Sequence, residues 1–231
     1  MNPFRSYRRL LPHTVSSTPF NSPRFYRLNS LTMKSLLNLI AWPAVAFAAA
    51  VPRDTPTGPF SAGAWRIAQG TDLFFFGTGI NASGGKFYIN KNTSTYCPEG
   101  VEGLDCAVYS GTGTTLVIGN STTTMSLEVS VPGGQQVYVG PDGALSYTQA
   151  HSAAMPANST VTGFSRARSE SFGAPIYLYS AHAWWWLCPV SEGEPRERTY
   201  QIFASDENPG DCYNTQIRTY TPDAGHVWQY A

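Results

Sequence analysis

The stretch VPGGQQVYVGPDGALSYTQAH, residues 131–151, has the pattern of a β-hairpin with its turn included. Its centre is GPDG, residues 140–143. Pro141 presets a φ of about −65° for the first central position of a type I turn, and Asp142 suits the second. Gly143 can then take a positive φ as a one-residue bulge. The sequence therefore predicts two antiparallel strands joined by a bulged type I turn.

The apolar residues on either side of the turn decide the register of this hairpin. A bulged turn pairs Val139 with Leu145 and Val137 with Tyr147, which places all four side chains on one face. A simpler two-residue turn would shift the register by one and divide the apolar set between both faces. We therefore favour the bulged turn, with Ser146 on the solvent-exposed face.

Outward from the hairpin, short segments rich in aromatic and β-branched residues alternate with turn residues about every 8 to 12 positions. The chain has 13 tyrosines and 12 phenylalanines, and no window keeps a helical period beyond a turn or two. We predict an all-β fold in one domain, residues 60–231, with the run LFFF at 73–76 buried on both faces. The segments expected to form strands are residues 60–67, 73–76, 87–89, 107–109, 115–118, 125–131, 161–166, 176–179, 184–188, 200–204 and 216–220.

The arrangement of these strands is open between two architectures. Apolar-Tyr-apolar triplets at 87–89, 137–139 and 176–178 are spaced by 50 and 39 residues. Three units of that size would suit a β-trefoil. Such triplets are common in tyrosine-rich strands, so a two-sheet sandwich or open barrel is ranked ahead and the β-trefoil is the alternative.

The N-terminal region predicts processing rather than folded structure. Residues 33–50 have the pattern of a signal peptide, with an apolar core at 36–48 and small residues that fit an A-x-A cleavage site. This run is short for a transmembrane helix. Residues 1–32 are arginine-rich and free of acids, like a mitochondrial targeting segment, but we favour an over-extended leader before a true start at residue 33. Residues 51–59 hold three prolines and are expected to be a linker.

The net charge changes once the first 50 residues are set aside. Six of the 15 Lys and Arg residues lie there, whereas all 15 Asp and Glu residues follow, so the remaining chain has a formal charge of −6. A mildly acidic domain argues against nucleic acid as a partner, because phosphates need a basic surface. No membrane partner is expected after cleavage of the signal peptide.

All four cysteines lie in the part that follows the signal peptide. An even number in a secreted chain predicts two disulfides, for which three pairings exist. We favour the two pairings that are local in sequence, Cys97 with Cys106 and Cys188 with Cys212. The sequence has no C-x-x-C motif, and its histidines show no ligand spacing, so no metal or other cofactor is expected.

Four N-x-Ser/Thr motifs follow the signal peptide, and none has proline in the middle. In a secreted chain this motif accepts N-linked glycan on surface loops. The predicted glycosylation sites are Asn81, Asn92, Asn120 and Asn158.

The run of three consecutive tryptophans at 184–186 is the most unusual local sequence in the chain. On a strand, Trp184 and Trp186 point to one face and Trp185 to the other. One interpretation is that Trp184 and Trp186 stack on sugar rings together with Tyr177 and Tyr179. We favour a structural role, in which one face of the run is buried in the core beside the second disulfide.

No arrangement of residues predicts catalysis. GFSRA at 163–167 departs from the G-x-S-x-G nucleophile motif because its last position is alanine. His151 and His182 stand alone in the sequence, and the spacing of the acids picks out no pair. We expect the protein not to be an enzyme.

The string PGGQQVYVGPDGALSYTQAHSAAMP, followed by GF, then WLCP and YQIFA, is similar to the fungal IgE-binding-protein family, which is related to the cell-wall protein PhiA. The resemblance covers residues 74–212. It implies secretion, residence in the cell wall or culture fluid, and antigenicity, with no known reaction.

These observations together predict a non-enzymatic, secreted or cell-wall-associated fungal glycoprotein and potential allergen. The alternative is a carbohydrate-binding module that uses the aromatic face around residues 184–186. The expected partners are cell-wall polysaccharide and, by the resemblance, host IgE.

Overall fold

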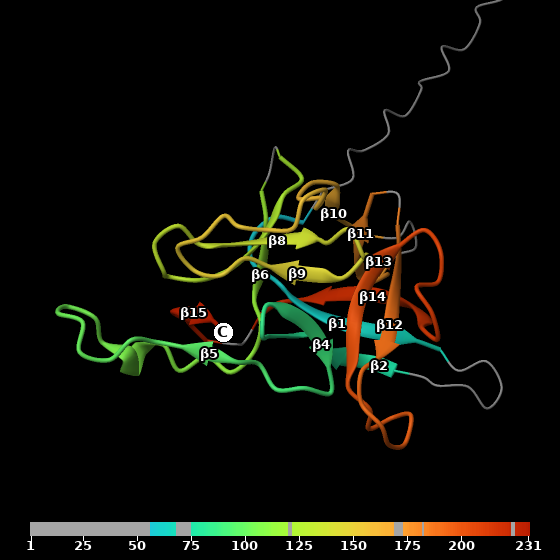
Figure 1. The fold of residues 1–231 in the computed structure, drawn as a ribbon, viewed down its shortest axis with the longest axis horizontal. Helices are drawn as coiled ribbons and strands as arrows, with labels where there is room; N and C mark the ends of the chain where they lie inside the picture. The colour runs from blue at the N-terminus through green and yellow to red at the C-terminus, as the bar shows by residue number, and fades with distance from the viewer. Residues whose placement is uncertain (1–55, 68–74, 120–121, 169–172, 182, 223–224) are drawn as a thin grey trace, which may run out of the picture. The chain divides into compact units, whose positions relative to one another are not determined.

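A computed structural model describes residues 56–231 apart from 68–74, 120–121, 169–172, 182 and 223–224. The predicted leader, the predicted signal peptide and residues 51–55 of the predicted linker lie outside the described residues. The described chain is nearly all β, as predicted, and its strands are antiparallel (Figure 1).

The strands follow one another through turns and longer loops. They are β1 (Ser61–Arg66), β2 (Phe75–Gly79), β3 (Asn81–Ser83), β4 (Lys86–Ile89), β5 (Thr95–Tyr96), β6 (Leu116–Ile118), β7 (Met125–Leu127), β8 (Gln135–Val139), β9 (Leu145–Tyr147), β10 (Phe164–Arg168), β11 (Ile176–Ser180), β12 (Trp184–Pro189), β13 (Tyr200–Ser205), β14 (Tyr213–Tyr220) and β15 (Gln229–Tyr230).

Thirteen of these strands form one branched sheet, and β5 pairs with β15 in a separate two-stranded sheet. Along the main path the order is β10-β11-β14-β12-β13-β4-β9-β8-β7-β6, with β1, β2 and β3 as branches. Strand β14 is the junction, because it pairs with β1, β11 and β12 (Figure 1). The sheet is not closed into a barrel, and the arrangement fits a β-sandwich around a shared core.

The β-trefoil alternative is not the architecture observed. The three apolar-Tyr-apolar triplets lie in β4, β8 and β11. Strand β4 pairs with β3, β9 and β13, whereas β8 pairs with β7 and β9, and β11 with β10 and β14. The triplets therefore occupy inequivalent places and do not mark a threefold repeat.

The hairpin of residues 131–151 has the predicted register, with Val139 opposite Leu145 and Val137 opposite Tyr147. Gly143 has φ of 83°, and its N–H donates to the carbonyl of Gly140 at 2.9 Å. The bulged turn is therefore confirmed. A side chain at Gly143 would also come within 3.2 Å of the Ala204 carbonyl oxygen, so this turn packs tightly on β13.

The expectation for Ser146 was wrong, because this residue is buried. Strand β9 lies between β8 and β4, where Lys86 is the partner of Ser146, and all three of its residues are buried. The hairpin was expected to be covered on one face only, but packing of distant strands covers the second face.

Two other strand expectations also need correction. The segment expected as a strand at 107–109 lies instead in and just after a 3₁₀ helix, Cys106–Val108. The start of this helix is capped by the Asp105 side chain, which accepts a hydrogen bond from the Ala107 N–H. In the run 73–76, the described Phe75 is buried but Phe76 is 59% exposed, so this segment is not buried on both faces. Its first two residues lie outside the described part of the chain.

Both disulfides have the predicted pairing. Cys97–Cys106 closes the loop after β5, and Cys188–Cys212 joins β12 to the residue before β14. No helix in the described residues is long and apolar enough to cross a membrane.

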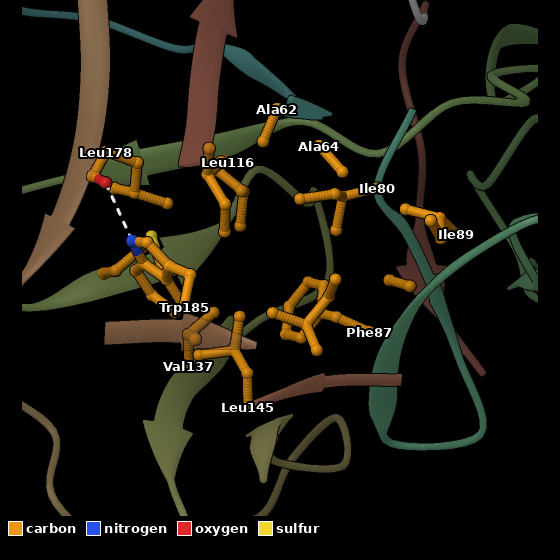
Figure 2. Close-up of a cluster of buried hydrophobic side chains, with 14 of the residues drawn as sticks. Ala62, Ala64, Ile80, Phe87, Ile89, Leu116, Val137, Leu145, Leu178 and Trp185 are labelled. Atoms are coloured by element: carbon orange, nitrogen blue, oxygen red, sulfur yellow. Dashed lines mark hydrogen bonds between the residues drawn. The ribbon is translucent and has the colours of Figure 1, made fainter. Parts of the chain in front are cut away.

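The core includes Phe87, Val137, Leu145 and Trp185, which come from four different strands (Figure 2). Trp185 is 5% exposed, and its indole Nε1 donates to the Leu178 carbonyl at 2.8 Å. This hydrogen bond satisfies the polar atom of a buried ring, as burial of tryptophan requires.

Candidate functional site

Side chains on the outer surface of strands β2, β1, β14 and β11 form a row that we call the aromatic face. The rings of Phe76 and Trp65 meet edge to face with centroids 5.2 Å apart. Arg218 follows on β14, and Tyr177 and Tyr179 on β11 lie 6.3 Å apart. Because side chains alternate along a strand, these five residues share one side of the sheet while their neighbours enter the core.

Arg218 joins the two halves of the aromatic face. Its guanidinium carbon lies 3.5 Å from the ring centroid of Trp65 and 5.6 Å from that of Tyr177. Among the described residues Arg218 has no acidic partner, and its Nε is buried without a hydrogen bond. The indole Nε1 of Trp65 is likewise buried without a hydrogen bond among the described residues. Stacking between the cation and the rings therefore holds this side chain in place.

Tyr220 extends the aromatic face over two glycines. A Cβ added to Gly63 would lie 2.9 Å from the Gly77 carbonyl oxygen and 3.0 Å from the Tyr220 ring. A Cβ added to Gly77 would lie 3.0 Å from the Tyr220 hydroxyl. The missing side chains on β1 and β2 allow this ring to lie close against the strands, and it remains 41% exposed.

The tryptophan run divides between the two sides of β12, as strand alternation predicted. Trp185 is buried, Trp184 is 66% exposed, and Trp186 is half-buried with its Nε1 donating to the Ser205 carbonyl. Trp186 is in register with Asn214, which points to the same side of β14 as Arg218. The favoured structural role therefore holds for Trp185, whereas Trp184 is available to a partner.

The four predicted stacking residues are only partly brought together. Tyr177 and Tyr179 contact each other, but among the described residues no ring contact links them to Trp184 or Trp186. Sequence reasoning missed Trp65, Phe76, Arg218 and Tyr220. Alternation within the sequence of β1 could have suggested Trp65, but only tertiary pairing shows that residues 61–66 lie beside residues 213–220.

The predicted glycosylation sites differ in exposure. Asn92 and Asn158 are exposed, and Asn158 lies in a turn with φ of 65°. Asn81 is half-buried in β3 and its amide donates to the Lys91 carbonyl at 2.7 Å. Asn120 lies outside the described residues, and occupancy of all four remains a prediction.

Of the two lone histidines considered for catalysis, the structure describes one. His151 is exposed after β9, and His182 lies outside the described residues. Within the described part of the chain, no three His, Cys, Asp or Glu residues form a cluster suited to a metal ion. The aromatic face, with the guanidinium of Arg218 stacked on Trp65, is therefore the candidate functional surface.

Fold and surface together define the class of this protein: an all-β domain with two disulfides and an exposed aromatic sheet face. The model of the PhiA-like secreted protein family matches residues 60–231. A protein of Arthroderma benhamiae named "Uncharacterized secreted protein" is 38% identical over 162 residues, which cover 65% of this chain and 76% of that protein. No solved structure matches the chain. The chain belongs to the PhiA-like secreted protein family and is a secreted protein, as its sequence indicated.

Proposed function

We propose that this protein is a non-enzymatic cell-wall protein that adheres to insoluble wall polysaccharide through its aromatic face. The observation that supports this proposal most directly is the stack of Trp65, Arg218 and Tyr177. It holds the centre of the face rigid while Phe76 and Tyr179 remain 59% and 46% exposed at its ends.

The shape of the aromatic face favours a polymer surface over a small soluble ligand. The contributing side chains come from four adjacent strands, so they are spread along a sheet and do not surround a hollow. Sugar rings present apolar C–H faces that pack on exposed aromatic rings, and rigid rings lose little conformational entropy on binding. An exposed apolar patch on a secreted protein also marks an interaction surface.

Retention on washed chitin and on insoluble β-glucan tests this function. Phe76→Ala combined with Tyr179→Ala should reduce the retained fraction at least about fivefold, because each exposed ring loses ~0.5–1.5 kcal/mol of contact. Val108→Ala is the matched control, since Val108 is 56% exposed but lies in the 3₁₀ helix away from these strands. Equal retention of the double variant and the wild type, with both folded, would refute the proposal.

Recognition by host IgE stays a prediction from the resemblance to the IgE-binding-protein family. Binding of the deglycosylated protein by serum IgE from exposed individuals tests it. Loss of all binding on removal of glycan would assign recognition to carbohydrate and not to this fold.

A further inference from the structure

A second surface feature is a cleft of about 1030 Å³ on another part of the domain. This volume is at the upper end of the range of small-molecule sites, roughly 300–1,000 Å³. Residues 132–151 of the hairpin stretch supply one side of the cleft, and the β5–β15 ribbon supplies another. The cleft includes none of the residues that form the aromatic face.

The walls of the cleft carry rings and amides. Tyr96 and Gln229 are cross-strand partners in the β5–β15 ribbon, so their side chains project to the same side. Tyr96 is 53% exposed. Gln149 and His151 are exposed on the turn after β9, where the Ser152 N–H donates to the Gln149 carbonyl and His151 has φ of 58°.

The floor of the cleft is buried, and its polar groups are already paired. Gln135 donates to the carbonyls of Thr148 and Tyr230 and accepts from the Tyr230 N–H at 2.8 Å. The Tyr147 hydroxyl donates to the Ala231 carbonyl at 3.1 Å. Burial raises the pKa of Tyr147 to about 12, and burial also raises the pKa of Tyr230, so both phenols are neutral below about pH 10. The side chains of the floor are therefore preorganised and uncharged.

The upper walls have hydrogen-bonding groups without partners in the described part of the chain. The side-chain amides of Gln149 and Gln229 make no hydrogen bond there, and neither does the Trp228 indole nitrogen. Trp228 is half-buried and its ring is held edge to face against Tyr109 at 5.4 Å. Among the described residues that line the cleft, none is Lys, Arg, Asp or Glu.

From this combination we infer that the cleft binds a single neutral glycan chain of hexose or N-acetylhexosamine units. Rings such as Tyr96 and Trp228 pack on the apolar faces of sugars, and free amides pair with hydroxyl or acetamido groups. A charged glycan would lose hydration and would meet no Lys, Arg, Asp or Glu side chain among the described residues of the cleft. This site is separate from the proposed adhesion surface, and either can exist without the other.

Isothermal titration of the secreted protein with three soluble hexamers tests the inference. The probes are a chitin hexamer, a β-1,3-glucan hexamer and an anionic oligogalacturonate hexamer. We expect one of the two neutral probes to bind with a dissociation constant below about 1 mM, and the anionic probe to bind at least about tenfold more weakly. The neutral probe that binds identifies the source of the sugar.

Two variants locate the binding. Tyr96→Ala should weaken the affinity for the neutral hexamer about tenfold, because it removes one stacked ring. Gln149→Ala should weaken the same affinity about fivefold, because it removes one hydrogen bond. Phe76→Ala combined with Tyr179→Ala should leave hexamer affinity unchanged, which separates the cleft from the aromatic face. Absence of binding by both neutral hexamers, equal binding of the anionic one, or affinity unaffected by both cleft variants would each overturn the inference.

Discussion

The aromatic face and the cleft are two surfaces of one domain that are built in different ways. The aromatic face consists of strand residues, such as Trp65 and Arg218, whose direction is set by alternation and whose neighbours enter the core. The cleft is lined largely by turns and by short β5 and β15, beside the Cys97–Cys106 loop. The aromatic face therefore depends on regular pairing of long strands, whereas the walls of the cleft depend on turns and on a loop closed by a disulfide.

The two surfaces also differ in charge. A stacked guanidinium lies in the centre of the aromatic face, whereas the described residues that line the cleft include no Lys, Arg, Asp or Glu. Exposed rings spread along a sheet suit the surface of an insoluble polysaccharide. A cleft with unpaired amides suits a single glycan chain. Damage to one region should consequently leave the other intact, except where the core itself is lost.

The largest expected effect comes from the buried tryptophan beneath the sheet. Trp185→Ala should lower the free energy of unfolding by ~3–5 kcal/mol, because it leaves a cavity and removes the hydrogen bond to the Leu178 carbonyl. Trp184→Ala should change it by no more than about 0.5 kcal/mol, since Trp184 is 66% exposed. Denaturant unfolding of both variants measures the difference, and equal midpoints would contradict the division of the run between core and surface.

The disulfides give a smaller effect that distinguishes the two regions. Replacing both Cys97 and Cys106 with serine opens a loop whose ends are 9 residues apart in sequence. This change should lower the free energy of unfolding by about 2–3 kcal/mol. We expect hexamer binding in the cleft to weaken while retention on insoluble polysaccharide is unchanged.

Serine at both Cys188 and Cys212 is the matched control, because this bridge anchors the chain just before β14. Its removal should weaken retention more than hexamer binding. If both pairs of variants impaired both activities equally, the two surfaces would not be independent.

The smallest expected effect concerns glycan. Peptide mapping of the secreted protein should find Asn92 and Asn158 occupied to a greater extent than Asn81, because the Asn81 amide is half-buried and hydrogen-bonded. None of these three residues lies on a strand of the aromatic face, so enzymatic deglycosylation should leave retention on polysaccharide unchanged. Fuller occupancy at Asn81 than at Asn92 would show that exposure in the folded chain does not govern glycosylation here.

Features with short-range causes could be predicted from the sequence. The bulged turn follows from the φ preferences of Pro141 and Gly143, and the hairpin register follows from where its apolar residues fall. The sequence likewise indicated the all-β class, both disulfides and membership of a secreted family. Each depends on residues close in the chain or on a likeness of whole segments.

Features that depend on which strands cover which faces were decided by tertiary structure alone. Alternation says that Ser146 and Tyr147 point to opposite sides, but not that packing of distant strands buries both. It likewise does not say that Phe76 is left outside, or that Trp65 meets Arg218 from the far end of the chain. The physical reason is that burial and ring stacking are set by pairing between distant strands, and a strand's own sequence does not name its neighbour.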